Sequence, residues 1–154
     1  MFRFELSSAG RTALGKVLID LLSKTDNKPV VFISAPASNV PNYKKNFENI
    51  KSLIGYVYNE KDYYIINPME IYDNMDPRVN YVDKLLIGYK VIDTLVDIMV
   101  VDDTDEELLR NSKGCTCELL QAYNKNITIV YLTGILGYLS QASLENDKEE
   151  QENG

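Results

Sequence analysis

Apolar residues along the chain alternate between helix-like spacing and short, dense runs. In three stretches they recur every three or four positions, which places them on one face of an α-helix; these stretches are residues 8–24, 42–58 and 81–96. Two more helices are expected at residues 115–125 and 135–142, and strands at residues 30–33, 63–66, 98–101 and 127–132, with a short edge strand as a candidate at residues 1–6. The run at residues 30–33 is continuously β-branched or aromatic, as in a strand that is covered on both faces.

Strands that alternate with helices predict the fold class. They indicate an α/β fold with an open, mostly parallel sheet, Rossmann-like or flavodoxin-like, and helices on both faces. The 154 residues suffice for one domain with its own core, expected over residues 1–143. Residues 144–154 hold five acidic residues, one lysine and no large apolar residue after Leu144. This composition predicts a disordered acidic tail.

Charge and hydropathy limit the partners. The net charge is −7, and the acidic tail leaves about −3 for the rest of the chain. No basic stripe is available to neutralise a phosphate backbone, so we expect no nucleic-acid partner. The apolar runs are too short to span a membrane, and the first residues lack the apolar core of a signal peptide. We therefore expect a soluble cytoplasmic protein without a membrane partner.

The chemistry available to the chain is restricted because it contains no histidine. A Ser-His-Asp triad, a Cys-His pair and a histidine base are excluded, so acid–base chemistry must rest on Asp, Glu, Lys, Tyr or Cys. Cys115 and Cys117 point apart on a helix, which disfavours a disulfide, and two thiols are too few for a zinc site. Both cysteines are interpreted as small, semi-buried residues, and no metal or cofactor is expected.

One carboxylate, Glu118, falls early in the helix that follows the third core strand. In an open α/β sheet, ligands bind beyond the carboxyl ends of the strands. The positive end of the helix would keep Glu118 ionised, either as a nucleophile or as a clamp for sugar hydroxyls. The alternative is that a glutamate early in a helix simply stabilises the helix.

Three loops should converge at the same sheet edge, because parallel strands share a direction; they are residues 34–39, 67–70 and 102–114. The first loop has small residues that could let a ligand approach the backbone, but it lacks the glycine pattern of a dinucleotide-binding loop. No Walker lysine pattern is present either. We predict one pocket at this edge, lined by Ser34, Asn67, Ser112 and Glu118.

Several short motifs together carry a family resemblance. They are Val31-Phe-Ile-Ser-Ala-Pro36, Ile66-Asn-Pro68, Asp97-Ile-Met-Val-Val101, Ser112-x-Gly114-x-x-x-Glu118-x-x-x-Ala122 and the strand at residues 127–131. The chain resembles the nucleoside 2-deoxyribosyltransferase-like superfamily, including small phage-type members and the deoxynucleoside-monophosphate N-glycosidases. The resemblance covers residues 29–132, which makes residues 1–28 an N-terminal extension.

The resemblance implies a function and a set of site residues. The helix glutamate, Glu118 here, would attack the anomeric carbon of a deoxyribose and expel the base, and a base or water would resolve the ester. Ser34 and Pro36, with Ala35 between them, would line the sugar or phosphate. Ser112 and Gly114 would donate hydrogen bonds to a phosphate or sugar oxygen.

Two departures from the family pattern keep a second function open. Tyr89 stands where the transferases carry an aspartate, and Phe32 stands where they often have a tyrosine that orients the nucleophile. Asp83 is a candidate proton donor to the leaving base, or else a solvated charge on a helix surface. One reading is an enzyme acting on an N-glycosidic bond. The alternative is a module that binds a nucleotide or a nucleotide-derived signal without turning it over.

The third reading is an assembly protein that recruits a partner through its N-terminal helix and its tail. The apolar stripe of residues 8–24 must be covered by the protein's own sheet or by a neighbouring subunit, and residues 131–142 offer further apolar surface. Family members commonly complete their pockets with a second subunit. We therefore expect a homodimer or a higher even oligomer, with a monomer capped by these segments as the counter-case.

Overall fold

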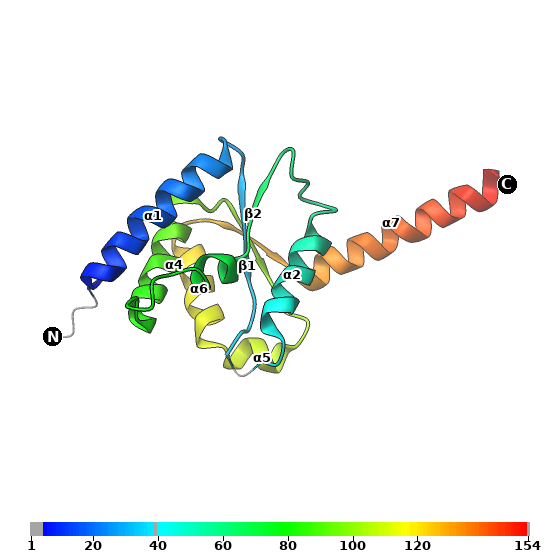
Figure 1. The fold of residues 1–154 in the computed structure, drawn as a ribbon. Helices are drawn as coiled ribbons and strands as arrows, with labels where there is room; N and C mark the ends of the chain where they lie inside the picture. The colour runs from blue at the N-terminus through cyan, green and yellow to red at the C-terminus, as the bar shows by residue number, and fades with distance from the viewer. Residues whose placement is uncertain (1–4, 39, 154) are drawn as a thin grey trace.

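The computed structural model describes residues 5–38 and 40–153, with side chains described up to residue 146. Its centre is a four-stranded, wholly parallel sheet in the order β2-β1-β3-β4. The strands are β1 (Val30–Ser34), β2 (Tyr64–Ile66), β3 (Ile98–Val101) and β4 (Thr128–Tyr131). Figure 1 shows this sheet edge-on between its helices. The predicted α/β fold with an open parallel sheet is confirmed.

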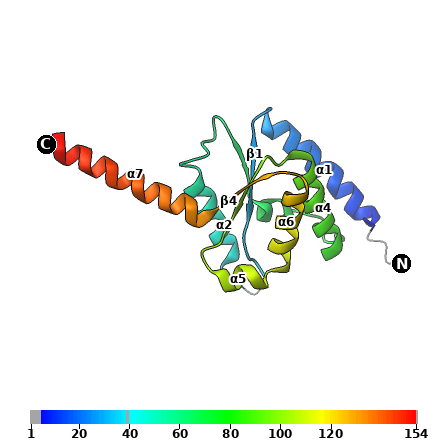
Figure 2. The same cartoon turned by 180° about the vertical axis from the view of Figure 1, so that it is seen from behind.

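Helices cover both faces of the sheet (Figures 1 and 2). On one face lie α1 (Ser8–Thr25), α4 (Tyr81–Leu95) and α6 (Lys113–Asn124); on the other lie α2 (Tyr43–Ile54) and α7 (Leu132–Asn153). Short helices α3 (Pro68–Tyr72) and α5 (Glu106–Asn111) sit in the loops after β2 and β3. Alternate residues of the buried strands point to opposite faces of the sheet and pack into two separate hydrophobic cores. Phe32 and Met99 lie in the core on the α4 side, and Ile33 and Val100 lie in the core on the α2 side.

The connections diverge between β1 and β3, the two central strands. The chain leaves β1 for α2 on one face and leaves β3 for α5 and α6, with α6 on the opposite face. Ser34 pairs with Val101 in the register of these strands, so the two loops start side by side. Such a point of divergence is where open α/β sheets bind ligands.

The apolar stripe of α1 covers the protein's own sheet. Leu21 is buried in the core that contains Phe32, and Ala13, Leu14 and Val17 pack against it. Only Ile19 and Leu22 of this helix remain as large exposed apolar side chains. The stripe therefore needs no second subunit, and the oligomeric state stays a prediction.

The two ends of the chain differ from their predicted structures. The candidate edge strand at residues 1–6 falls partly outside the described residues, and Glu5 and Leu6 are not in a strand. At the other end, α7 continues to Asn153, where a disordered tail was predicted. The tail holds four glutamates, one glutamine and one lysine, and it has no Gly or Pro before Gly154. These residues favour a helix as readily as disorder, because their straight side chains lose little freedom in it.

The start of α7 also differs, since Leu132, expected at the end of a strand, is the first helical residue. Asp103, in the loop after β3, accepts hydrogen bonds from the backbone N–H and the hydroxyl of Thr133, at 2.9 and 2.6 Å. This contact caps the helix from a distant part of the chain. Within the described residues, no helix combines the length and apolarity needed to cross a membrane.

Candidate functional site

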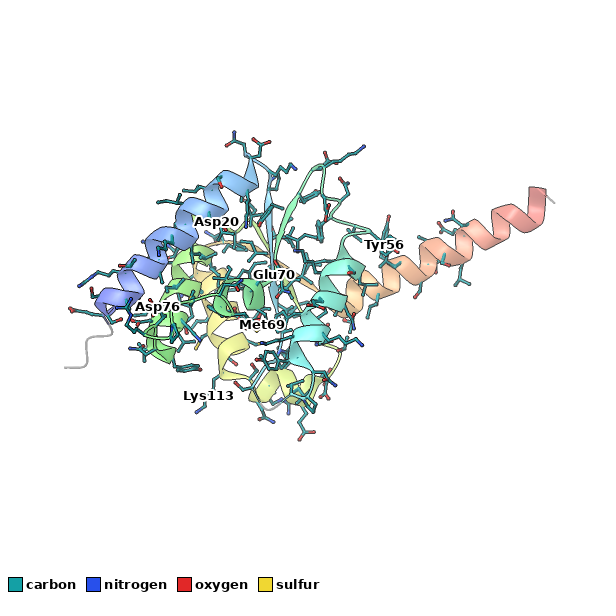
Figure 3. All side chains as sticks on the ribbon, in the orientation of Figure 1. Asp20, Tyr56, Met69, Glu70, Asp76 and Lys113 are labelled. Carbon is teal, nitrogen blue, oxygen red and sulfur yellow. The ribbon has the colours of Figure 1, made fainter. Side chains whose placement is uncertain are left out.

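A cavity of about 450 Å³ opens at the carboxyl edge of the sheet, on the α4 and α6 side. Its walls come from the loop after β1, from α3 and α4, and from α5 and the first half of α6, with Phe47 added from α2. Figure 3 labels two of its wall residues, Met69 on α3 and Lys113 at the start of α6. Its volume is within the range of small-molecule pockets, about 300–1,000 Å³.

Glu118 projects into this cavity from the second turn of α6. The hydroxyl of Ser34, the last residue of β1, donates a hydrogen bond of 3.0 Å to its Oε1. Burial raises the pKa of Glu118 to about 8, against the opposing effect of the Ser34 hydrogen bond. The expectation that the helix start keeps Glu118 ionised is wrong, because the helix field fades beyond the first turn and desolvation of the carboxylate outweighs it.

Three tyrosines form the aromatic side of the cavity: Tyr72 from α3, and Tyr81 and Tyr89 from α4. Tyr72 lies over Gly88, where an added Cβ would come within 2.3 Å of its hydroxyl oxygen. Burial, and then the charge of Glu118, raise the pKa of Tyr72. Burial, and then a hydrogen bond with Cys117, raise the pKa of Tyr89. The phenols of Tyr72 and Tyr89 therefore stay neutral at all ordinary pH values.

The polar end of the cavity is the start of α6. Ser112 caps the helix by accepting a hydrogen bond of 3.2 Å from the backbone N–H of Cys115. Asn111, Lys113 and Gly114 line the cavity beside it. A side-chain amide, an ammonium group and the first helix amides thus lie at one end, where an anionic group of a ligand would be stabilised.

Most residues predicted for the site come together here. The cavity is lined by Ala35, Pro36, Tyr89, Ser112, Gly114 and Glu118. Ser34 reaches it through its hydrogen bond to Glu118. Asn67 does not line it, because its side chain caps α3 by accepting a hydrogen bond of 3.1 Å from the backbone N–H of Met69.

Asp83 is neither the proton donor nor the solvated charge that the sequence suggested. It is buried, and its carboxylate accepts hydrogen bonds from the backbone N–H of Ser7 at 2.9 Å, from the hydroxyl of Ser7, and from the backbone N–H of Asn80 at 3.2 Å. These bonds, led by that of the Ser7 hydroxyl, lower its pKa. Asp83 therefore joins the starts of α1 and α4 and is not among the residues that line the cavity.

The sequence pattern does not point to Tyr72 and Tyr81 as site residues. It places no helix or strand between residues 66 and 81, because Asp73-Asn74 and Asp76-Pro77 in this stretch are typical of turns. The available signal was Asn67-Pro68, an N-cap residue followed by proline at the first helical position, which marks a helix start. That signal predicts α3 and would have placed Tyr72 one turn above the sheet edge.

The cysteines and possible metal ligands add no second site. Cys115 is buried and Cys117, expected to be semi-buried, is exposed; both are free thiols. Within the described residues, no group of three or more His, Cys, Asp or Glu side chains is arranged to hold a metal ion.

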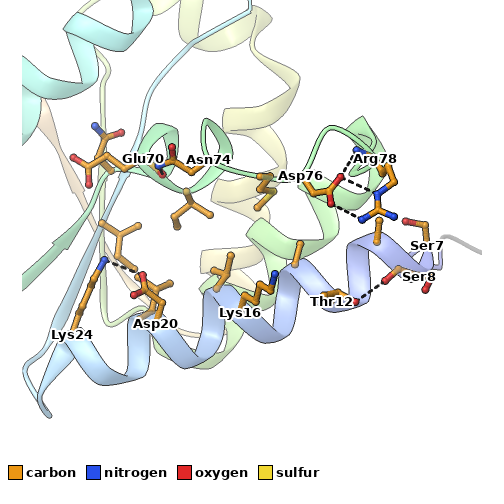
Figure 4. A pocket seen from close by; sticks show the side chains of 18 of the residues that line it. Ser7, Ser8, Thr12, Lys16, Asp20, Lys24, Glu70, Asn74, Asp76 and Arg78 are labelled. Carbon is orange, nitrogen blue, oxygen red and sulfur yellow. Dashed lines mark hydrogen bonds and ion pairs between the residues drawn. The ribbon is translucent and has the colours of Figure 1, made fainter.

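A larger cavity of about 730 Å³ lies between α1 and the α3 segment (Figure 4). Its charged side chains are exposed and largely paired with one another: Lys24 with Asp20 at 2.9 Å, and Arg78 with Asp76 at 2.7 Å. Exposed pairs of this kind contribute little energy, about 0–1 kcal/mol. Among the described residues that line this larger cavity, none is a buried reactive group, so the smaller cavity around Glu118 is the candidate site.

Comparison of the chain with protein-family models, with curated proteins and with solved structures finds no match. The geometry around Glu118 is therefore the basis for assigning a function.

Proposed function

We propose that this protein cleaves or transfers the N-glycosidic bond of a deoxynucleoside or deoxynucleotide, with Glu118 as the nucleophile. The observation that supports this most is the half-buried Glu118, which lines the cavity at the carboxyl edge of the sheet and whose carboxyl group accepts a hydrogen bond from Ser34. The resemblance of residues 29–132 to the nucleoside 2-deoxyribosyltransferase-like superfamily is consistent with it.

In the proposed reaction, the base packs against Tyr72, Tyr81 and Tyr89, since aromatic faces stack on nucleobases. Glu118 attacks the anomeric carbon, the carbon–nitrogen bond breaks, and its electron pair leaves with the base. Water or an acceptor base then attacks the resulting ester and restores the carboxylate, as in a retaining glycosidase. Ser34 orients the attacking oxygen through its hydrogen bond, and the polar start of α6 holds the sugar or a 5′-phosphate.

The charge of Glu118 sets the pH dependence of this reaction. A nucleophilic carboxylate must be ionised, and burial raises the pKa of Glu118 to about 8. For the free enzyme, kcat/KM should therefore rise about tenfold per pH unit below the pKa and level off above it. A glutamate that acted as a general acid would give the opposite slope.

The test is release of free base, followed by chromatography, from the four deoxynucleosides and their 5′-monophosphates. Glu118→Gln should lower the rate by at least about a thousandfold while the fold is retained, because removal of a covalent nucleophile costs several orders of magnitude. Glu48→Gln, a matched change at an exposed position of α2, should leave the rate unchanged. An unchanged rate in Glu118→Gln would overturn the assigned role.

A second candidate function is a module that binds a nucleotide without turning it over. The raised pKa of Glu118 favours it, because a protonated carboxyl at neutral pH is a hydrogen-bond donor and a poor nucleophile. Tight binding of a deoxynucleotide by the wild type, with no base release between pH 6 and pH 9, would select this function.

A further inference from the structure

The cavity around Glu118 combines one carboxyl group with several aromatic rings. Among the described residues that line it, Glu118 is the only aspartate or glutamate. Tyr72 supplies a ring from α3, and Tyr81 and Tyr89 supply rings from α4. A carboxylate next to aromatic faces is the surrounding that a flat organic cation prefers, through charge attraction and cation–π contacts.

The same cavity lacks a suitable acid for a neutral leaving base. Tyr72, Tyr89 and Cys115 hold their protons too tightly, since burial raises the pKa of each. Lys113 and Tyr81 are exposed at the rim, and Asp83 is engaged with Ser7. Glu118 cannot be the proton donor and the ionised nucleophile in the same step.

From these two features we infer that the leaving base is already a cation: the substrate is an N-glycoside of a positively charged heteroaromatic ring, such as a pyridinium or an N-alkylated purine. This inference rests on the proposed function and names its substrate class. Such a ring departs as a neutral molecule and needs no proton from the protein.

The bond changes balance without a further reagent. The carboxylate of Glu118 forms a bond to the anomeric carbon, and the electron pair of the broken carbon–nitrogen bond neutralises the ring nitrogen. Water then attacks the ester, the carboxylate is released, and one proton passes to the solvent. The products are a neutral heterocycle and the free sugar.

Binding of a cation should also ionise Glu118. The titratable and charged groups around the carboxyl are Tyr72 from α3, Tyr81 and Tyr89 from α4, and Lys113 and Cys115 from α6, with Asp102 beyond the end of β3. None of these groups supplies a buried positive charge beside Glu118. A cationic ligand would supply it and so stabilise the ionised carboxylate. Below the pKa of Glu118, binding should release one proton, and affinity should rise about tenfold for each pH unit.

The binding test uses nicotinamide 2′-deoxyriboside and its dihydro form, which have nearly the same shape but differ in the ring charge, together with their 5′-phosphates. Calorimetry at pH 6 and pH 7 should show that the cation binds at least tenfold more tightly than the dihydro form. Repeating it in buffers of different ionisation heat should show that binding of the cation releases a proton. Glu118→Gln should remove this preference, and Glu48→Gln should keep it. Equal affinities for the two forms in the wild type would overturn the inference.

The turnover test compares release of nicotinamide from the cation with release of bases from the neutral deoxynucleosides. Faster, Glu118-dependent release of nicotinamide supports the inference. Cleavage of neutral deoxynucleosides with no preference for the cation overturns it and leaves the proposed function standing. Absence of release from every substrate overturns both, even where the cation binds.

Discussion

Asp83 and Glu118 are carboxyl groups on neighbouring helices, and they differ in the number of hydrogen bonds that they accept from the protein. Asp83 on α4 accepts three hydrogen bonds from Ser7 and Asn80, and its pKa is lowered. Glu118 on α6 accepts one, from Ser34, and burial raises its pKa to about 8. Both are carboxyl groups close to a helix start, and they differ in the number of donors that reach them. A carboxylate saturated by protein donors is structural, whereas one with spare acceptor sites in a cavity is available to a ligand.

The hydrogen bonds of Asp83 therefore hold α1 and α4 together and stabilise the fold. The placement of Glu118, in contrast, lowers the stability of the folded protein when its carboxyl group is charged. An enclosed carboxyl that is short of donors opposes folding whenever it is charged. Natural proteins tolerate such groups mainly at functional sites. Four predictions test this contrast.

The largest effect is expected in the pH dependence of stability. The pKa of Glu118 in the folded protein, about 8, lies above its usual value of 4.5, so its contribution is fully present below pH 4.5 and is lost as the pH rises toward 8. Glutamine mimics the protonated form and removes this loss. Glu118→Gln should thus be more stable than wild type by about 4 kcal/mol at pH 8, with little difference at pH 4.5.

Urea unfolding at both pH values measures this difference, and Asp83→Asn is the contrasting variant. The pKa of Asp83 is lowered below 3.8, so its contribution is present above that pH and is lost as the pH falls. Asp83→Asn should be destabilised at neutral pH and approach wild type in acid. Equal pH profiles for the two variants would contradict the contrast.

The second prediction concerns Gly10, which lets α1 approach Asp83. An added Cβ would lie 2.6 Å from the Asp83 carboxyl carbon, in a buried contact. Gly10→Ala should lower the unfolding free energy by about 1–3 kcal/mol, as overpacking does. Gly15→Ala, in the same helix with nothing within 4 Å, should instead raise it by about 0.5–1 kcal/mol. Thermal unfolding of the two variants should thus move in opposite directions.

These contrasts also mark what the sequence could predict. The buried strands follow from dense apolar runs such as Val30–Ser34, because parallel strands covered on both faces need them. The location of Glu118 follows from the strand–helix alternation, since strand direction alone decides which loops converge. Ser112 is placed by the same reasoning, whereas Ala35 and Pro36 are assigned to the site through the family resemblance.

The rest depends on contacts between distant parts of the chain. Asp83 has a structural role because its carboxylate accepts hydrogen bonds from Ser7, the N-cap residue of α1, which is 76 positions away in the sequence. No local sequence pattern predicts this contact. The pKa of Glu118 depends on how completely its neighbours exclude water, which periodicity does not show. Asn67 was assigned to the site, but its side chain serves the first turn of α3.

The third prediction tests the aromatic wall. Gly88 is buried, and an added Cβ would lie 2.3 Å from the hydroxyl oxygen of Tyr72, the far end of a side chain that can turn aside. Gly88→Ala should displace Tyr72 into the cavity and weaken ligand binding by about tenfold, equivalent to about 1.4 kcal/mol. Calorimetry with nicotinamide 2′-deoxyriboside measures the change in affinity. Gly137→Ala, with nothing within 4 Å, is the control and should bind as wild type does.

The smallest effect is expected at Ser34, which among the described residues is the one hydrogen-bond donor to Glu118. A hydrogen bond to a carboxylate favours its charged form, so Ser34→Ala should raise the pKa of Glu118 further above 8. A hydrogen bond to a charged group contributes about 1.5–3 kcal/mol at most, and rebinding of water reduces this, so the rise should stay below about one pH unit. The rising limb of kcat/KM against pH should move to higher pH by this amount, and the ¹³C titration of the Glu118 carboxyl should show the same shift.

Ser38→Ala is the control, because it removes a hydroxyl that lines the same cavity without a hydrogen bond to Glu118, and it should leave the titration of Glu118 unchanged. A shift to lower pH in Ser34→Ala would mean that Ser34 stabilises the protonated acid, and the contrast between Glu118 and Asp83 would then lose its basis in donor number.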